Sequence, residues 1–339
     1  MATQGKKGVL LVNLGTPDAP TYGAVYRYLK EFLMDKRVVD INPIARNLLV
    51  KGIIAPFRSK PTSELYKQVW TKDGSPLKVF GYKVEEGVQE ILGEDYIVKL
   101  AMRYQSPSIE SGLEALKEAK VSEIIIFPMF PQYSSACVGS VHAEVMRLLS
   151  KNLNIPAIKF VGTYYDHPKF IDAFEARGRQ YNLEDYDFVL FSYHGIPERQ
   201  IRKTDDFNHC KLGECCNCIT EDNQFCYRAH CFATTRAIAQ RFNLSEEQYS
   251  VCFQSRLGRD PWLLPSTSDV IEGLAKEGKK NVLVYCPSFV SDCLETTIEV
   301  SIEYMEEFEE VGGEHLQLVE GLNDHPLWIE AVSHIIKEY

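Results

Sequence analysis

The sequence predicts an α/β protein built from two doubly wound units, each with a four-stranded parallel sheet covered by helices on both faces. Three observations support this prediction. Short runs of apolar residues, rich in Val and Ile, alternate with longer stretches of helical periodicity. Several runs are apolar at nearly every position, as expected for parallel strands buried on both faces. Motifs of the first half also recur in the second half.

The expected strands form two sets of four. Those of the first half cover residues 8–15, 96–104, 123–130 and 157–164, and those of the second half cover residues 187–195, 249–256, 281–289 and 315–322. Asp-His-Pro begins at Asp166 and again at Asp324, and Pro-x-Phe begins at Pro128 and again at Pro287. Asp-His-Pro alone is an ordinary helix start, since Asp caps a helix and Pro fits its first turn. Two repeats with nearly the same spacing favour a duplicated unit.

The repeat also predicts where the chain divides. We expect an N-terminal domain at residues 1–164 and a C-terminal domain at residues 165–325, which carries a cysteine-rich insert at residues 207–231. The last helix, residues 326–339, is a candidate for packing back on the N-terminal domain. Ligands of open α/β sheets bind beyond the C-terminal ends of the strands, so the loops after the strands form the candidate site.

The composition excludes several classes of protein. Of 339 residues, 45% are hydrophobic and 25% are charged, which is typical of a globular protein and not of a disordered or collagenous chain. The formal net charge is −10, so a nucleic acid is not an expected partner. No run reaches the ~18 apolar residues that span a bilayer, and the N-terminus lacks the apolar core of a signal peptide. We therefore expect a cytoplasmic protein.

No nucleotide-binding motif is complete. The first strand is not followed by Gly-x-Gly-x-x-Gly. Residues 273–280 resemble a phosphate-binding loop but end in Lys280 where Ser or Thr is required, and they precede a strand instead of following one. A nucleotide is therefore not an expected ligand. The loops after the strands instead combine Gly, Pro, aromatic and a few polar residues, which suits a flat apolar ligand that carries some charge.

Two groups of ionisable side chains stand at strand ends. His194 closes the fifth strand, and an imidazole with an ordinary pKa near ~6.5 suits proton transfer or metal binding, although histidines in such positions are often only structural. Glu295, Glu299 and Glu303 follow the seventh strand at a spacing that places them on one face of a helix. Asp292 lies one turn earlier. Such a stripe is either a solvated surface or a path that carries protons or cations into a site.

A cysteine-rich segment lies between the fifth and sixth strands. Six of the ten cysteines fall within it, namely Cys210, Cys215, Cys216, Cys218, Cys226 and Cys231. In a protein expected to be cytoplasmic, such a cluster indicates metal binding and not disulfides. Four thiolates can hold either structural zinc or an iron–sulfur cluster, and the spacing does not distinguish the two.

In chain order, the strand-end motifs resemble those of ferrochelatases, the terminal haem-synthesis enzymes, which insert Fe²⁺ into a porphyrin. The matching stretches, spread over nearly the whole chain, are V-N-L-G-T-P at 12–17, G-S-P-L at 74–77, P-Q-Y-S-S at 131–135, S-Y-H-G-I-P-E-R at 192–199, Q-S-R-L-G-R-D-P-W at 254–262 and C-P-S-F-V-S-D-C-L-E-T at 286–296. The resemblance implies a lyase-type metal chelatase with two Rossmann-like domains and protoporphyrin IX as its substrate.

The resemblance also implies roles for individual residues. His194 and Glu295 correspond to the family's metal-site histidine and its partner carboxylate. A neutral imidazole can accept a pyrrole proton and hold Fe²⁺, while the row of carboxylates carries protons away. The expected porphyrin contacts are the aromatic residues Tyr133 and Phe289, with Arg58 and Ser75 near the propionates. Cys293 stands where some members have a second histidine, and the C-L-E-T variant of this chain resembles the Gram-negative type.

For the cysteine segment, the resemblance favours a 2Fe–2S cluster over zinc. Some ferrochelatases carry such a segment between the same two motifs, where it is associated with a 2Fe–2S cluster. The expected ligands are Cys210, one of Cys215 and Cys216, Cys226 and Cys231, with Cys218 as the spare thiol. Metal insertion needs no electron, so the cluster would be structural or redox-sensing.

Two questions stay open at this point. Residues 47–60 mix apolar side chains with Lys51, Arg58 and Lys60, which predicts either a core-facing helix and a loop or an apolar lip. Such a lip would contact a membrane surface transiently and make the protein peripheral to the inner membrane. The alternatives to a protoporphyrin ferrochelatase are a coproporphyrin ferrochelatase, a cobalt chelatase and a non-catalytic carrier of tetrapyrroles or metals.

Overall fold

The computed structural model of the protein describes residues 5–256, 258 and 260–339. Residues 1–4 of the expected N-terminal domain lie outside the described residues, as do Leu257 and Arg259 of the Q-S-R-L-G-R-D-P-W motif. The described chain divides into two units. The first comprises the residues up to Phe130, Ser135–Gly162 and Ile329–Tyr339, and the second comprises Pro131–Ser134 and Thr163–Trp328.

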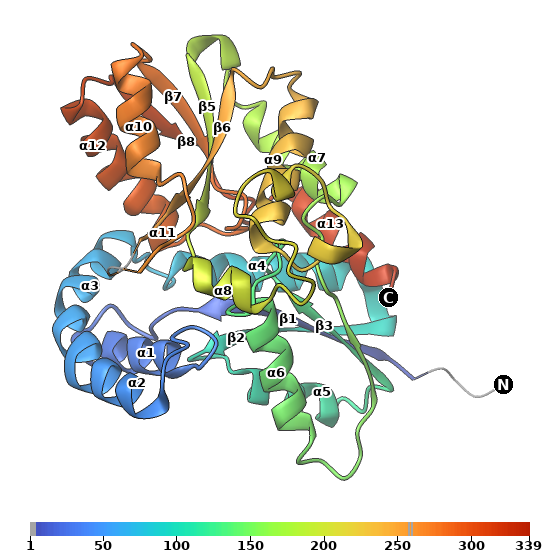
Figure 1. Ribbon diagram of the computed structural model, residues 1–339. Coiled ribbons are helices and arrows are strands. Elements are labelled where there is room, and N and C mark those ends of the chain that lie inside the picture. The colour runs from blue at the N-terminus through green and yellow to red at the C-terminus, as the bar shows by residue number, and fades with distance from the viewer. Residues whose placement is uncertain (1–4, 257, 259) are drawn as a thin grey trace. The chain divides into compact units, whose positions relative to one another are not determined.

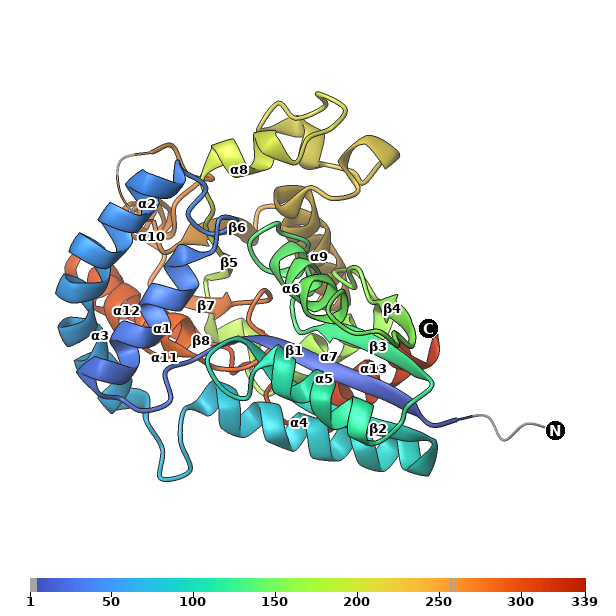
Figure 2. The same ribbon diagram turned by 90° about the horizontal axis from the view of Figure 1, so that it is seen from below.

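The first unit is built on a parallel sheet of four strands in the order β2-β1-β3-β4 (Figure 2). The strands are β1 (Lys7–Gly15), β2 (Tyr96–Tyr104), β3 (Glu123–Pro128) and β4 (Ala157–Phe160). The helices are α1 (Tyr22–Met34), α2 (Pro43–Leu49), α3 (Ala55–Val69), α4 (Pro76–Leu92), α5 (Ile109–Glu118) and α6 (Val138–Leu149). A π-helical segment, Val50–Ile54, joins α2 to α3, and a 3₁₀ turn, Gly93–Asp95, follows α4.

Helices cover both faces of this sheet. Leu10 and Val12 of β1 belong to one apolar cluster with buried residues of α5 and α6. On the opposite face, a Cβ at Gly81 of α4 would lie 2.8 Å from Leu100 Cδ2 of β2. A Cβ at Gly87 would lie 2.7 Å from Cδ1 of Ile329 in helix α13 (Pro326–Lys337), so these glycines let α4 approach its neighbours closely.

The second unit has a four-stranded parallel sheet in the order β6-β5-β7-β8 (Figure 1). The strands are β5 (Phe188–His194), β6 (Tyr249–Gln254), β7 (Asn281–Tyr285) and β8 (His315–Leu318). The helices are α7 (Pro168–Gly178), α8 (Glu198–Lys203), α9 (Tyr227–Arg241), α10 (Thr267–Lys276), α11 (Leu294–Thr297), α12 (Met305–Glu310) and the start of α13. A π-helical segment, Glu299–Tyr304, precedes α12, and 3₁₀ turns occupy Leu183–Asp185, Glu214–Cys216 and Glu221–Asn223.

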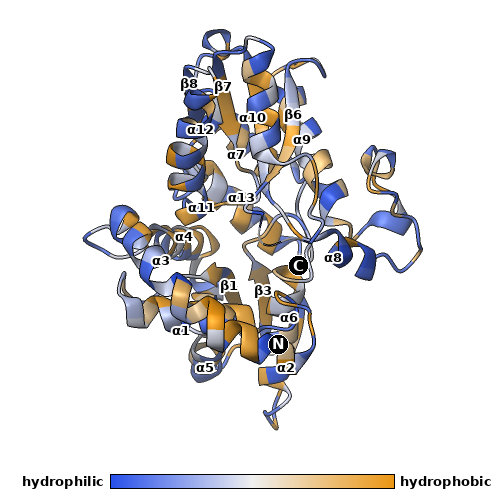
Figure 3. Cartoon of the chain, turned by 60° about the vertical axis from the view of Figure 1, so that its left-hand side comes forward, coloured by the Kyte–Doolittle hydropathy of each residue, from blue (hydrophilic) through white to orange (hydrophobic). Residues whose placement is uncertain are grey.

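This sheet is also covered on both faces. Helices α10 and α12 lie on one side of it, and α7 and α9 lie on the other (Figure 1). Strand β7 is buried at four of its five positions and is coloured hydrophobic in Figure 3. The near-continuous apolar character of this strand therefore follows from its place inside a sheet with two covered faces.

The predicted fold class is confirmed, because both sheets are four-stranded, all-parallel and flanked by helices. Both also place the first strand of their unit second in the order, as a duplicated unit would. The expected strands were too long, however: five of the eight end two to four residues before the expected point. Met129, Val161 and Val319 remain buried after the strands have ended. In these strands, apolar sequence therefore continues past the last strand residue, where a main-chain hydrogen bond to the neighbouring strand is still made.

The units divide after Gly162, whereas the sequence placed the boundary after residue 164. Pro131–Ser134, the loop after β3, belongs to the second unit because α9 holds it. Gln132 Nε2 donates to Thr234 Oγ1 at 3.0 Å, and the Tyr133 main-chain N–H donates to His230 Nδ1 at 3.1 Å. Helix α7 starts at Pro168 with His167 in the N-cap position, and not with Asp166 as the repeat suggested.

A buried carboxylate ties three elements of the first unit together. Asp35 follows α1, and its Oδ2 accepts hydrogen bonds from Ser140 Oγ at 2.5 Å, Arg103 Nη2 at 2.8 Å and Tyr104 Oη at 3.0 Å. Its Oδ1 accepts from the Arg37 main-chain N–H at 2.8 Å. Burial raises the pKa of Asp35, but the bonds from Ser140 and Arg37 and the charge of Arg103 outweigh it, so the pKa is lowered overall.

Asp35→Asn should therefore remove a pH-dependent part of the stability. A carboxyl group whose folded pKa is depressed stabilises the fold above its ordinary value of 3.8 and loses that contribution as the pH falls through the folded pKa. At pH 6 we expect the variant to unfold with a free energy about 2–4 kcal/mol lower. Urea unfolding at pH 6 and pH 3 tests this, with exposed Asp95→Asn as the control. An equal loss at both pH values would contradict the assignment.

Candidate functional site

His194 is the last residue of β5 and is half-buried. Its Nδ1 lies 2.6 Å from the Gly195 carbonyl oxygen, and its main-chain carbonyl accepts a hydrogen bond from Tyr227 Oη at 2.8 Å. The Phe289 ring centroid lies 6.3 Å from the imidazole centroid. The Gly195 carbonyl favours the tautomer with its proton on Nδ1, which gives Nε2 the lone pair that accepts a proton or binds a metal.

The expected row of carboxylates follows β7. Glu295 lies on α11 and Glu299 opens the π-helical segment, and both are half-buried, whereas Glu303 is exposed. Burial, together with the charges of Glu299 and Glu306, raises the pKa of Glu303. The row therefore runs from the interior of the second unit to its surface.

Gln254 at the end of β6 organises this row. Its Nε2 donates to the Glu295 carbonyl at 2.8 Å and to Glu299 Oε2 at 3.2 Å. In a continuous α-helix, the Glu295 carbonyl would accept from the Glu299 main chain, so the inserted amide interrupts that pattern. The single α-helix expected for Glu295, Glu299 and Glu303 is instead a short α-helix followed by π-helix. Ser255 Oγ and Tyr304 Oη also donate to Glu299, at 2.5 and 3.1 Å.

Asp292 is buried and its carboxylate is fully engaged in holding local structure. It accepts from Asn323 Nδ2 at 2.6 Å, Thr296 Oγ1 at 3.1 Å and the Gly321 main-chain N–H at 3.2 Å. The neighbouring Cys293 has its pKa raised by burial and by the charge of Glu295. A thiol in that state stays protonated at neutral pH and is a poor metal ligand.

Tyr133 belongs to the second unit and is positioned by His230. His230 is fully buried, and burial lowers its pKa to about 4, so the ring is neutral at pH 7. Its Nδ1 accepts from the Tyr133 main-chain N–H at 3.1 Å, and its Nε2 lies 2.8 Å from the Gln224 carbonyl. The Tyr133 ring lies 5.3 Å from the ring of Phe225. A neutral histidine thus links the cysteine segment to the loop that carries Tyr133.

The other two expected porphyrin contacts lie in the first unit. Ser75 precedes α4, is buried, and accepts a hydrogen bond from Thr16 Oγ1 at 2.8 Å. Arg58 lies on α3 and is exposed. The described structure thus places His194, Phe289, Tyr133 and the carboxylate row in one unit, and Ser75 and Arg58 in the other.

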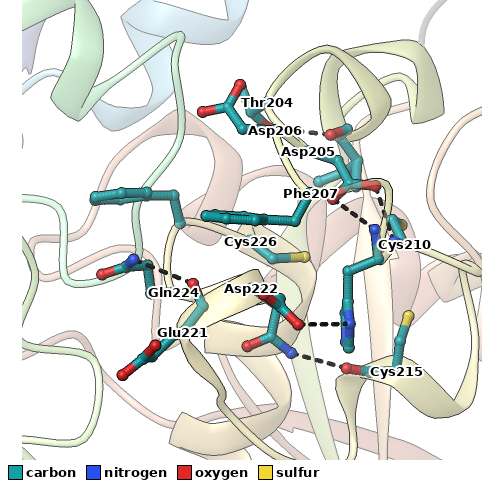
Figure 4. Close-up of a pocket in the computed structure, with 14 residues that line it drawn as sticks. Thr204, Asp205, Asp206, Phe207, Cys210, Cys215, Glu221, Asp222, Gln224 and Cys226 are labelled. Atoms are coloured by element: carbon teal, nitrogen blue, oxygen red, sulfur yellow. Dashed lines mark hydrogen bonds and ion pairs between the residues drawn. The ribbon is translucent and has the colours of Figure 1, made fainter.

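Five thiols of the cysteine segment, those of Cys210, Cys215, Cys216, Cys226 and Cys231, influence one another. Cys216 and Cys226 share a hydrogen bond that raises the pKa of Cys216 and lowers that of Cys226. Burial and the charges of Cys215 and Cys216 raise the pKa of Cys210. Figure 4 shows Cys210, Cys215 and Cys226 around one pocket, together with Asp205 and Asp222. Cys218 is exposed, and Cys231 is fully buried on α9.

The main chain around these thiols is held by two polar side chains. Asp205 accepts from the main-chain N–H groups of His209 at 3.0 Å and Cys210 at 2.8 Å. Asn223 is buried and donates to the carbonyls of Cys215 at 2.9 Å and Cys218 at 2.8 Å. The Lys211 main-chain N–H donates to Cys215 Sγ at 3.2 Å.

Gln254 and Ser255 lie in motifs quoted from the sequence, but neither was given a role there. His230 was noted only as a neighbour of Cys231, and Tyr227 was not identified. The signal for the first two was their place directly after a predicted strand, where ligands of parallel sheets bind. Tyr227 and His230 lie in a helix between cysteines, and no local pattern shows what their side chains reach.

Within the part of the chain that the structure describes, no helix has both the length and the apolar character required to cross a membrane.

The chain was compared with known proteins. The ferrochelatase family profile matches residues 6–339. A ferrochelatase of Coxiella burnetii (strain CbuK_Q154) is 42% identical over 98% of this chain and 94% of its own length. A ferrochelatase of Legionella pneumophila (strain Lens) is 43% identical over 98% of this chain and 99% of its own.

The structure of SirB from Bacillus subtilis with Fe³⁺ is similar in fold, with a TM-score of 0.55 and 13% identity over 98% of this chain and 95% of that one. The resemblance seen in the strand-end motifs is thus confirmed over nearly the whole sequence. The chain belongs to the ferrochelatase family.

Proposed function

We propose that His194 and Glu295 carry the reaction of this family, the insertion of Fe²⁺ into protoporphyrin IX in the last step of haem synthesis. Family membership over nearly the full length supports the reaction and its class, a metal-chelating lyase. The observation that carries the residue assignment is the arrangement of His194. Its Nδ1 is engaged by a carbonyl, and an aromatic ring, Phe289, lies beside it.

The reaction requires two pyrrole protons to leave and Fe²⁺ to shed water. His194 accepts a pyrrole proton at Nε2, and the Gly195 carbonyl stabilises the resulting imidazolium through Nδ1–H. Glu295 is the first carboxylate of the row and lies at its interior end. Protons pass along Glu295, Glu299 and Glu303 toward solvent, while Asp292 holds the start of α11 through its bonds to Thr296 and Asn323.

The porphyrin itself is held by aromatic and polar contacts. Tyr133 and Phe289 provide apolar surface for the macrocycle, which gains most of its binding free energy from desolvation and ring contacts. Ser75 and Arg58 provide a hydroxyl and a guanidinium for the propionates. Binding energy gained away from the reacting nitrogens can bend the ring and expose their lone pairs.

His194→Ala should abolish turnover and leave porphyrin binding largely intact. Loss of a general base lowers turnover by about 10²–10⁴-fold, whereas the apolar contacts of the ring persist. Anaerobic assays that follow porphyrin absorbance measure turnover with Fe²⁺, and fluorescence quenching measures porphyrin binding. The matched control is His315→Ala, which removes an exposed histidine at the start of β8. A His194→Ala variant with near-normal turnover would rule out this role.

We also propose that the cysteine segment holds a 2Fe–2S cluster through Cys210, Cys215, Cys216 and Cys226. These four thiols influence one another, whereas Cys218 is exposed. Cys231, an expected ligand, is left out of this set because its thiol is fully buried on α9 and bonded by Tyr227. Tetrahedral zinc with Zn–S bonds of about 2.3 Å needs sulfurs about 3.8 Å apart. Among the described residues of this segment, no three donor atoms of Cys, His, Asp or Glu lie within 4.8 Å of one another.

When bound, the cluster supplies a one-electron redox centre, which iron insertion does not use. The role of the cysteines is therefore structural or redox-sensing. Asp205 and Asn223 hold the main chain on either side of the ligands, and the Lys211 N–H bonds a ligand sulfur.

Replacing Cys210 and Cys226 together by Ser should bleach the visible absorption of the protein and remove its iron and acid-labile sulfide. Two lost thiolates leave too few ligands for a cluster. Cys218→Ser is the matched control, since its exposed thiol lies outside the interacting set and its removal should leave the colour unchanged. Unchanged colour in the double variant would defeat the assignment. Stoichiometric zinc in a colourless wild-type protein would show that the segment holds zinc and not an iron–sulfur cluster.

A third proposal concerns the apolar residues between 44 and 57. Ile44, Leu48, Ile53 and Phe57 expose 73, 69, 56 and 74% of their surface, and the exposed Lys51 and Lys60 lie among or beside them. Apolar side chains flanked by lysines suit the surface of an anionic bilayer. We propose that these four exposed apolar side chains contact a membrane transiently and that the protein acts in the cytoplasm as a peripheral protein.

Leu48→Ser combined with Phe57→Ser should weaken sedimentation with phosphatidylglycerol-containing vesicles about tenfold or more. Each side chain loses the free energy of burying its apolar surface in the lipid. Leu153→Ser is the control because Leu153 is fully exposed, at 103%, and lies outside residues 44–57. Binding of the double variant equal to that of the wild type would exclude the contact.

A further inference from the structure

The first turn of α9 connects the cysteine segment to the candidate site. Tyr227 is the first residue of this helix and directly follows Cys226, which occupies the N-cap position. Its side chain is buried, and its hydroxyl donates to the main-chain carbonyl of His194 at 2.8 Å. Tyr227 is also in hydrogen-bond contact with the Cys231 thiol one turn further along α9. One hydroxyl group thus contacts both His194 and a cysteine of the segment.

The main-chain carbonyl of His194 lies at the point where β5 ends. His194 is the last residue of β5, and it pairs with Gln254 in β6. Beyond it the main chain turns away, and the Gly195 carbonyl accepts the contact from His194 Nδ1. The position of the Gly195 carbonyl, and with it the orientation of the imidazole, depends on the His194–Gly195 peptide that precedes it. Tyr227 fixes that peptide by holding its oxygen.

The same turn of α9 holds a second part of the site. His230 follows Tyr227 by three residues, so the two side chains lie on the same side of the helix. Its Nδ1 accepts from the Tyr133 main-chain N–H, and its Nε2 contacts the Gln224 carbonyl in the cysteine segment. Two candidate site residues, one on β5 and one after β3, are thus bonded to one buried turn that begins at Cys226.

We propose that Tyr227 is a positioning residue for iron insertion, which fixes His194 and transmits the state of the cysteine segment to it. The proposal rests on the role assigned to His194 above. When the thiols around Cys226 are held in place, the N-terminus of α9 is fixed and Tyr227 keeps the His194 carbonyl in position. When Cys226 is free to move, Tyr227 moves with it.

Tyr227→Phe tests the positioning role. It keeps the ring and removes the hydroxyl, so we expect kcat for Fe²⁺ insertion to fall about 5- to 30-fold while KM for protoporphyrin stays unchanged. The visible absorption should also stay unchanged, since no cysteine is altered. The matched control is Tyr193→Phe, which removes another buried hydroxyl that joins β5 to α9, through Thr235 Oγ1 at 2.8 Å. A general loss of stability would affect both variants alike.

The link to the cysteines is tested by a double-mutant cycle. Cys216→Ser, with exposed Cys218→Ser as its control, should bleach the absorption and lower kcat, and Tyr227→Phe should then add little further loss. Independent, multiplicative losses would overturn the link, as would an unchanged kcat in a bleached Cys216→Ser protein. If Cys216→Ser does not fold, the comparison of kcat between Tyr227→Phe and Tyr193→Phe still decides whether Tyr227 is a positioning residue.

The outcomes separate this proposal from the function on which it rests. An active wild type, an inactive His194→Ala variant and a normal kcat for Tyr227→Phe would overturn the positioning role and leave the role of His194 intact. Normal turnover of the His194→Ala variant would instead rule out both the role of His194 and the positioning role of Tyr227. Equal losses of kcat in Tyr227→Phe and Tyr193→Phe would reduce the effect to loss of packing and also overturn the proposal.

Discussion

The candidate site of the second unit depends on one buried amide. Gln254 is 1% exposed, and its Oε1 accepts a hydrogen bond from Ser192 Oγ at 2.8 Å. That bond fixes which end of the amide faces β5, so both hydrogens of Nε2 point toward the start of the helical segment after β7. There they bond the carbonyl of Glu295 and the carboxylate of Glu299. The break in the α-helix and the placement of the carboxylates both follow from this orientation.

The surroundings of Glu299 and Glu303 differ in a way that matters for proton transfer. Three donors converge on the Glu299 carboxylate, from Gln254, Ser255 and Tyr304. Glu303 is exposed as a residue, but partial desolvation of its carboxyl group and the charge of Glu299 raise its pKa. A raised pKa favours a carboxyl group that takes up a proton and releases it to water. Along the row, the surroundings therefore change from a half-buried carboxylate held by three donors to an exposed one.

The sequence was sufficient for the fold class and for the residues at strand ends, since both depend on local patterns. Eight apolar runs specified two parallel sheets, and the start of each strand was placed to within one residue. Strand ends were misplaced because residues such as Val161 stay buried beyond the last residue of the strand and still donate a main-chain hydrogen bond to the neighbouring strand. His194 and Glu295 were proposed from motifs that follow strands and from the family resemblance. The partners of His194 could not be found, because Tyr227 approaches it from 33 residues away in the chain.

The place of the cysteine segment in the chain explains how it can influence the site without altering the fold. It is inserted between β5 and α9, and lengthening such a connection costs little free energy because the cost grows only with the logarithm of loop length. The sheet keeps its order of strands, and α9 keeps its face against β5 through Thr235 and Tyr193. The first turn of α9 is shared between the segment and the site, and Phe225 of the segment also lies beside the Tyr133 ring. A change among the thiols therefore reaches His194 and Tyr133 through Tyr227 and His230, while the rest of the sheet stays as it is.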